Sequence, residues 1–471
     1  MKAEPGWRVI AGIAACAMFM TQLDGAVLAT ALPQIADDFG VPTMALSLSI
    51  TVYLTALVAM LPAGGWLADR FMPRRIFLAA TSVFLAGSLL CALCTGYWPF
   101  IAARTLQGLG ASLMGPVAML MLLKMTPKDR LVSAMAFATA PMLLAPTFGP
   151  TLGGFLVTYA SWPVIFLINL PLGAATLAFA YHSLPRNHAR GGRSLDVLGL
   201  LLTSGALIAL LTGIDRVAAP GGGAAGAMIL VAGAALSYVA IRHLRRHPDP
   251  VIALAPLRDP VFRTTSLIAG PLIRVSLRAP PFLLPLLFQL EMGMSPLAAG
   301  AMLLALNGGD LAMKPAVALV IRRFGYGHAL AAVGAIGAIA GFACILFRPG
   351  FPILGIVLIL AVSGMARSVM LTGIASLSYT DVPPEQLTAA NVLMNIGQHV
   401  TAAFSVSFSA LLLQATAALQ GEVEPKLLAF RIALATVAAL GLAGTLLLYR
   451  SARTGHAAYR RPDFELTPED R

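Results

Sequence analysis

Apolar segments of about 20 residues follow one another along the chain, separated by short connections that contain charged residues, Pro or Gly. A helix of about 20 apolar residues is long enough to cross the hydrocarbon core of a bilayer. The pattern therefore predicts an all-α integral membrane protein with fourteen transmembrane helices. Their predicted ranges are 9–32, 44–68, 76–95, 98–123, 132–158, 162–183, 195–214, 224–241, 263–290, 296–321, 328–347, 351–378, 387–417 and 428–449.

Basic residues gather on alternate connections between these segments and on both termini. The opposite connections hold only Arg216, Arg348 and Lys426. Because an excess of Lys and Arg marks cytoplasmic loops, the pattern predicts that both termini are cytoplasmic, which requires an even number of spans. The first apolar run continues past Asp24 and is too long for a signal-peptide core, so it is interpreted as a retained span.

Composition supports the same class of protein. The 471 residues are 58% hydrophobic and 11% charged, which excludes a soluble globular protein. The net charge of +12 does not predict nucleic-acid binding, because the basic residues lie in short loops. We find no Walker-type nucleotide loop, no His and Cys metal cluster and no Ser, His and Asp arrangement. The sequence therefore predicts neither an enzyme nor an ATP-driven pump, with no cofactor and no metal. The four cysteines lie in apolar runs and are interpreted as packing residues.

Two loops divide the chain into comparable halves. The predicted organisation is an N-terminal six-helix bundle (1–185), a linker with a two-helix hairpin (186–260), a C-terminal six-helix bundle (261–450) and a cytoplasmic tail (451–471). The hairpin has no charge within its apolar parts and is expected to be a spacer that faces lipid. The connection 65–71 (GWLADRF) resembles 318–325 (ALVIRRFG), a weak repeat of the kind from which many secondary transporters are built.

One carboxylate, Asp24, lies inside the first apolar segment. Burying a charge at membrane depth costs several kcal/mol of free energy unless the charge pairs, meets water or takes up a proton. We therefore take an acid at such a position as a candidate functional residue. Two interpretations stay open at this point. Asp24 is either a protonation switch or a structural hydrogen-bonding residue.

Several motifs occur in order on the predicted helices. They are 23–33 in the first helix, Gly65, Asp69, Arg70, Arg74 and Arg75 in the next connection, 104–111 (RTLQGLGA), 149–154 (GPTLGG), and 161–171 around Trp162 and Asn169. Through them the chain resembles the major facilitator superfamily, specifically its fourteen-helix drug:proton antiporter branch of multidrug exporters. The resemblance implies two six-helix bundles plus the central hairpin, a bacterial cytoplasmic (inner) membrane location, and transport energised by the proton gradient.

Two of these motifs suggest a conformational gate. Asp69 can pair with a helix terminus or with the basic cluster that begins at Arg70. Such a pair would stabilise one conformation and break when the two halves move against each other. Alternatively, the basic residues only set the orientation of the helices in the membrane. The predicted gate also includes Gly149, Pro150, Gly153 and Gly154, since small residues let two helices approach closely. Packing alone explains these glycines equally well, and Met72 replaces the family glycine that would favour a tight turn.

The resemblance assigns Arg104, beside Gln107, to proton coupling; a structural arginine satisfied by carbonyls is the alternative. In the second half, Arg274, Asp310 and Arg367 are predicted at a common depth of roughly 16 to 18 Å from the cytoplasmic ends of their helices. Arg278 and Lys314 lie four residues beyond Arg274 and Asp310 and are therefore on the same helix faces. We expect proton coupling by Asp24, Asp310 and Arg104, and a substrate cavity lined by Gln107, Arg274, Arg278, Lys314 and Arg367.

The apolar segments contain two acids, Asp24 and Asp310, and five cations. This excess of positive charge favours an anionic substrate, because arginine binds carboxylates and phosphates bidentately. The five cations are Arg104, Arg274, Arg278, Lys314 and Arg367. The expected function is a proton-coupled exporter of small molecules, in multidrug or toxic-compound efflux. An exporter of an organic anion, such as a carboxylate metabolite or metal–carboxylate complex, is the alternative; a passive channel or membrane sensor fits less well. Expected partners are the substrate, protons and membrane lipid, with no nucleic acid. A monomer is expected, and nothing in the sequence identifies a periplasmic adaptor.

Overall fold

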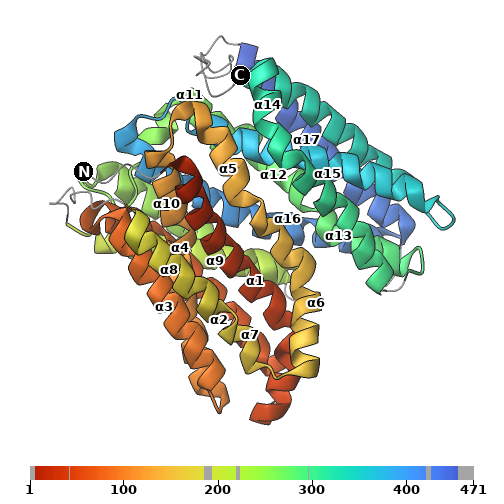
Figure 1. Cartoon of the computed structure of the whole chain (residues 1–471). Helices are drawn as coiled ribbons and strands as arrows, with labels where there is room; N and C mark the ends of the chain where they lie inside the picture. Colours follow the sequence, from red (N-terminus) through yellow and green to blue (C-terminus); the bar gives the residue numbers. More distant parts are fainter. Residues whose placement is uncertain are drawn as a thin grey trace.

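The computed structural model describes residues 6–41, 43–184, 194–218, 223–294, 296–420 and 426–453, and within these residues it contains helices and no strand (Figure 1). The α-helices are α1 (Trp7–Phe39), α2 (Thr43–Phe71), α3 (Pro73–Leu93), α4 (Tyr97–Met125), α5 (Leu131–Thr139), α6 (Leu144–Tyr159), α7 (Pro163–Leu167), α8 (Asn169–Ser183), α9 (Val197–Ala218), α10 (Gly223–Arg246), α11 (Pro260–Arg263), α12 (Ala269–Arg278), α13 (Pro280–Leu290), α14 (Pro296–Ala343), α15 (Ile353–Ser378), α16 (Leu387–Leu419) and α17 (Leu427–Arg453). Short helical turns join some of them, and Thr264–Ile268 forms a π-helix (η4).

The predicted all-α membrane architecture is confirmed. Twelve helices among the described residues are long and apolar enough to cross a membrane. One of these, Ala298–Leu346, covers two predicted spans, because two helical segments follow each other directly in α14 and are separated only by a kink at Gly325. The predicted fifth span is absent from the twelve because a 3-10 turn at Pro141–Leu143 divides it into α5 and α6. Helix α1 continues past its predicted end and stops at Gly40, whose φ of 63° provides the C-cap.

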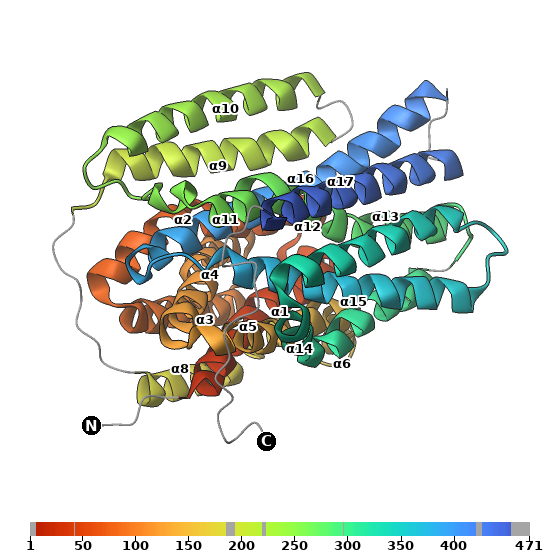
Figure 2. The ribbon, with the colours of Figure 1, turned by 90° about the horizontal axis from the view of Figure 1, so that it is seen from above.

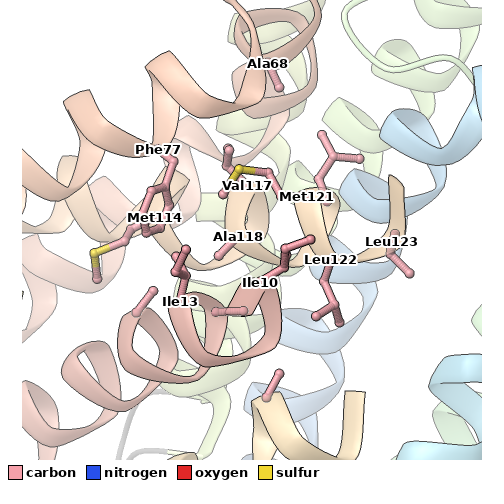
Figure 3. Packing of buried hydrophobic residues seen from close by; sticks show 14 of the residues in the cluster. Ile10, Ile13, Ala68, Phe77, Met114, Val117, Ala118, Met121, Leu122 and Leu123 are labelled. Carbon is pink, nitrogen blue, oxygen red and sulfur yellow. The ribbon is translucent and has the colours of Figure 1, made fainter. Parts of the chain in front are cut away.

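The helices pack as two halves, α1–α8 and α11–α17 (Figure 1). In the first half, an apolar cluster joins the ends of α1, α2, α3 and α4, with Ile10, Phe77, Met114 and Met121 interdigitated (Figure 3). The last turns of α2 and α4 and the turn within α14 carry basic residues on one end of the molecule, which we call the basic end; it includes Arg70, Arg74, Lys124, Lys128, Arg322 and Arg323. The start of α1 and the last turn of α17 lie at this end, uppermost in Figure 1.

The two halves contact each other at the basic end. Thr388 of α16 donates a hydrogen bond to Asp69 of α2 (2.9 Å), and Lys128 donates to the carbonyl of Thr380 (2.7 Å). The apolar cluster of the first half also includes Tyr379 and Met394 from the second half. At the opposite end, the principal contacts of α6 and α13 are with helices of their own halves. The halves are therefore joined mainly where the basic residues lie.

The hairpin α9–α10 lies along the side of this assembly, with α10 outermost (Figure 2). Large apolar side chains of α10 are exposed, such as Val231 (70%) and Met228 (68%), as expected for a surface that faces lipid. Helix α9 differs from the prediction of a simple spacer, because it packs against both α2 and α16. Ser204 of α9 donates a hydrogen bond to the carbonyl of Ala59 in α2 (2.6 Å). One helix of the hairpin thus covers the seam between the halves.

The two repeated connections adopt nearly the same backbone conformation. Met72 has φ 72° and ψ 136°, and Gly325 has φ 72° and ψ 161°. Only glycine adopts this region without strain, and a side chain there costs about 1–3 kcal/mol. The tight turn is therefore retained in the first half although methionine occupies the glycine position.

We expect Met72→Gly to raise the stability of the folded protein by about 1 kcal/mol, because relief of backbone strain outweighs the greater entropy of glycine in the unfolded chain. The measurement is the thermal unfolding midpoint of the purified protein in detergent. Met125→Gly, at the end of α4 where φ is helical, is the matched control and should lower the midpoint. A lower midpoint for Met72→Gly would show that the turn is not strained.

Candidate functional site

Asp24 lies at the centre of a buried polar network in the first half. Its side chain is fully enclosed, and Arg104 of α4 donates to Asp24 Oδ2 across 2.7 Å. Gln107 donates from Nε2 to Asp24 Oδ1 (2.7 Å), and the Gln107 Oε1 accepts from Arg104 (2.6 Å). The predicted residues Asp24, Arg104 and Gln107 are thus brought together. Distances of this kind are typical of strong charge-assisted hydrogen bonds.

Four further residues complete the network, and sequence reasoning did not assign them. Ser88 of α3 accepts hydrogen bonds from Gln107 and from Asn169 of α8, both at 3.0 Å. Asn169 Nδ2 also lies 3.5 Å from Asp24 Oδ1. The Arg104 guanidinium lies 4.5 Å from the ring centroid of Tyr53 and 5.9 Å from that of Phe166, a cation–π arrangement on both sides. The available signal was the occurrence of polar side chains within otherwise apolar helices.

Close helix contacts hold this network in place. A Cβ at Gly108 of α4 would lie 2.5 Å from the carbonyl oxygen of Tyr53, so glycine is required for α2 and α4 to meet here. A Cβ at Gly149 of α6 would lie 2.5 Å from the Cβ of Ala26, two residues after Asp24. Gly149 therefore forms the close contact between α6 and α1 that its motif suggests. Gly153 is also buried in α6, whereas the surroundings of Pro150 and Gly154 lie outside the described residues.

A second charged cluster lies inside the other half. Asp310 of α14 is 1% exposed; its Oδ2 is 3.5 Å from Arg367 Nε, and its Oδ1 is 3.7 Å from Lys314 Nζ. These are ion-pair distances rather than hydrogen bonds, and Asp310 Oδ1 has no hydrogen-bond donor in the described part of the chain. The pair around Asp310 is therefore looser than the one around Asp24.

Lys314 connects this second cluster to the first half. Its ammonium group donates to Thr372 of α15 (3.1 Å) and to Thr139 at the end of α5 (3.2 Å). A Cβ at Gly364 of α15 would lie 1.9 Å from the carbonyl oxygen of Leu306, so α14 and α15 approach closely beside the Asp310 pair. Lys314 therefore lies between Asp310 and a contact of the two halves.

Arg274 and Arg278 are not among the ion-pair partners of Asp310 in the described part of the chain. Arg274 is buried and donates to the carbonyl of Thr265 in the π-helix (3.1 Å) and to the sulfur of Met394 (3.1 Å). Arg278 donates to the carbonyl of Gln398 in α16 (3.0 Å). Neither arginine is within ion-pair distance of a carboxylate among the described residues. Both guanidinium groups therefore lack an acidic partner among the ion pairs of the described residues.

The predicted gate residue Asp69 lies at the basic end, beside a cavity of about 560 Å³ between the halves. It pairs with Lys124 (3.4 Å), a partly exposed pair, and accepts from Thr388 near the beginning of α16. The neighbouring Arg74 instead donates to the carbonyl of Tyr181 in the last turn of α8 (2.7 Å). Asp69 thus joins the halves through Thr388, whereas Arg70 lies exposed in the last turn of α2.

Comparison with known proteins agrees with this architecture. The profile of the Major Facilitator Superfamily matches residues 14–406. The chain belongs to the Major Facilitator Superfamily. It is 34% identical over 408 residues to "Putative multidrug resistance protein MdtD" of Cronobacter sakazakii, which covers 86% of this chain and 85% of that protein. The protein of the same name from Serratia proteamaculans is 33% identical over 409 residues, with 85% and 84% covered.

Solved structures of the superfamily share the fold. The human organic anion transporter MFSD10 has a TM-score of 0.66 at 17% identity and covers 94% of this chain and 100% of its own. The proton:xylose symporter XylE has a TM-score of 0.63 at 13% identity, with 94% and 95% covered. A bacterial homologue of the iron transporter ferroportin, in an outward-facing state, has a TM-score of 0.62 at 13% identity, with 94% and 99% covered. Together with the family match and the twelve apolar helices among the described residues, this makes the chain a multi-pass transporter of the superfamily.

Proposed function

We propose that the protein is a proton-coupled exporter of small molecules that works by alternating access, in multidrug or toxic-compound efflux. In this proposal it resides in the bacterial inner membrane with its basic end in the cytoplasm, as the distribution of Arg and Lys favours. The multidrug relatives support this class of substrate. In this proposal, the contacts between the halves at the basic end would hold that end together in one state of the cycle and break in the other.

The observation that carries the proposal is the enclosed carboxylate of Asp24, held by Arg104 and Gln107. A proton on Asp24 would remove its negative charge and with it the ion pair to Arg104. Because a buried charge without a partner is costly, the network must then rearrange. Rearrangement beside the close contact of Gly149 with Ala26 would change how α1 and α6 pack. Proton uptake from one side and release to the other would in this way drive the exchange of conformations.

The second cluster offers a route to the contact between the halves. Lys314 lies between Asp310 and Thr139 of the other half. A proton on Asp310 would weaken the attraction that positions Lys314 and so change a bond across the two halves. Asp310 is therefore the second candidate for proton coupling, while Asp69 and Thr388 would hold the basic end closed.

A transport screen in proteoliposomes tests the function. The purified protein is reconstituted, and uptake of a cationic dye and of a tricarboxylate is measured with and without an imposed pH gradient. We expect one class of compound to accumulate only when the gradient is present. Equal transport of all compounds with and without the gradient would contradict proton coupling and would favour a passive channel.

A second candidate, export of an organic anion, is favoured by Arg274 and Arg278. Both are positively charged, lie next to each other on α12, and have no carboxylate partner among the described ion pairs. A carboxylate or phosphate substrate would supply the missing negative charge. The likeness in fold to a human organic anion transporter is compatible with this candidate.

Under this second candidate, we expect Arg278→Gln to lower tricarboxylate transport about tenfold, the factor that corresponds to loss of about 1.4 kcal/mol of binding. Dye transport should change little. Arg216→Gln, an exposed arginine at the far end of α9, is the matched control and should behave as wild type. Dye transport that is independent of Arg278, together with no tricarboxylate transport at all, would eliminate the anion candidate.

A further inference from the structure

A separate polar cluster lies where α9 begins and α10 ends, on the side of the molecule that Figure 2 shows. Asp196 caps α9: its Oδ1 accepts from the backbone N–H of Gly199 (2.8 Å), and its Oδ2 accepts from that of Val251 (3.2 Å). Burial raises the pKa of Asp196, but the hydrogen bonds from Gly199, His243 and Val251 outweigh it and keep that pKa below its ordinary value. Two backbone N–H groups therefore hold this carboxylate in place at the start of α9.

Two histidines face this carboxylate. His243 and His247 are four residues apart at the end of α10, which places them on one side of the helix. His243 Nε2 lies 2.8 Å from Asp196 Oδ1, and the two imidazole centroids are 5.2 Å apart. The backbone N–H of Asp249 donates to His247 Nδ1 (3.2 Å), which orients that ring. One ligand atom from each of Asp196, His243 and His247 lies within 4.8 Å of the others.

We propose that Asp196, His243 and His247 form a binding site for a divalent transition metal ion of the Zn²⁺, Co²⁺ or Ni²⁺ class. Two imidazole nitrogens and one carboxylate oxygen suit these ions, whereas Ca²⁺ and Mg²⁺ prefer oxygen ligands alone. Asp196 is buried while both histidines are partly exposed, so an ion can enter from the histidine side. Water would complete the coordination sphere.

Metal binding requires the three ligand atoms to adjust, because those now up to 4.8 Å apart must close toward the ligand spacing around a bound ion. Two ligands bound at about 2.0–2.2 Å in a tetrahedral site lie roughly 3.3 Å apart. The present 2.8 Å between His243 and Asp196 is the distance of a hydrogen bond, so metal binding would replace the shared proton and separate the two groups by about 0.5 Å. The carboxylate itself is already held by two backbone N–H groups, the kind of outer support that orients metal ligands.

Metal at this site would fasten the start of α9 to the end of α10, beside the place where the hairpin packs against the second half. The segment after α10 contributes Val251 and Ile252 to an apolar cluster that includes Leu244 of α10 and Val392 of α16. An ion held by the start of α9 and the end of α10 would fix these two helix ends next to this cluster. The three ligands belong to neither the Asp24 cluster nor the Asp310 cluster, so Zn²⁺ binding can be measured separately from proton-coupled transport.

The test uses the full chain, purified in detergent with an affinity tag that contains no histidine. We expect isothermal titration with Zn²⁺ to show one site per chain and Zn²⁺ to raise the thermal midpoint. The double variant His243→Gln/His247→Gln should lower the affinity at least ~10-fold, the lower bound known for disturbed metal sites. His182→Gln/His328→Gln is the matched double control and should bind as wild type. His247→Gln alone, at a partly exposed position, should also weaken binding and keeps the test valid if the double variant does not fold.

Co²⁺ serves as a second probe, because its absorption spectrum distinguishes nitrogen and oxygen ligands from thiolates. Bands without sulfur-to-metal charge transfer would support the proposed ligands. Strong charge-transfer bands would place the ion on the free cysteines instead, and this would overturn the proposal. Failure of the wild-type chain to bind Zn²⁺, or unchanged affinity in the double variant, would overturn it as well.

Discussion

Asp24→Asn is expected to reduce transport driven by a pH gradient to the level of protein-free liposomes. Asparagine has nearly the same shape as aspartate but cannot carry the negative charge or exchange a proton, so the link between proton movement and Arg104 is lost. Exchange of substrate between the two sides without a gradient should persist, because it does not require net proton movement. Gradient-driven uptake and gradient-free exchange, measured on the same preparation, separate loss of coupling from loss of folding.

The control for this experiment is Asp37→Asn. Asp37 lies on the same helix, α1, but is exposed, so its variant should retain gradient-driven transport. Full gradient-driven transport by Asp24→Asn would remove Asp24 from the coupling mechanism. Loss of exchange together with uptake would assign Asp24 a structural role instead, as the bonds from Gln107 and Asn169 would allow.

Asp310→Asn is expected to destabilise the folded protein by about 3–5 kcal/mol, because it leaves Arg367 and Lys314 as buried cations without a carboxylate. The measurement is the thermal unfolding midpoint in detergent, where a change of this size gives a drop of several degrees. Adding Arg367→Gln to Asp310→Asn should recover part of the loss, since it removes one unpaired charge.

Asp129→Asn provides the comparison for a pair at the surface. Asp129 and Arg130 are 3.3 Å apart, with side chains 39% and 27% exposed, so water screens their attraction. Its variant should change stability by less than about 1 kcal/mol. If Asp310→Asn has no larger effect than Asp129→Asn, the cluster around Asp310 contributes no net stability, and its proposed link to Thr139 loses its support.

The spans could be predicted from the sequence, because apolar segment length and loop charge depend on local composition alone. The superfamily was identified by resemblance, through motifs such as 104–111 and 149–154. Asp24 and Arg104 could be selected as unusual charges inside apolar segments. Their direct contact spans 80 positions in the chain and depends on how α1 and α4 turn toward each other. Asn169 belonged to a motif that sequence reasoning noticed, yet its contact with Asp24 needed the structure.

Depth along a helix was a weaker guide. The helical rise per residue predicts that Arg274, Asp310 and Arg367 lie at the same depth in the membrane. Depth alone does not determine the direction in which a side chain points around the helix axis. In the structure Arg274 turns toward Thr265 and Met394 instead. Asp69 likewise pairs with Lys124 and Thr388 and not with the adjacent arginines. The sequence could not predict these partners, because they lie on other helices, α4 and α16.

Because α9 packs against both α2 and α16, the two sides of the transporter differ in how far the interface of the halves is covered from lipid. On this side the hairpin lies between the lipid and the interface of the two halves. It would therefore block lateral entry of an apolar molecule from the bilayer into that interface. On the other side, where α5 meets α14 and α15, no corresponding extra pair of helices lies among the described residues. Sideways entry from the membrane would therefore be confined to a single flank.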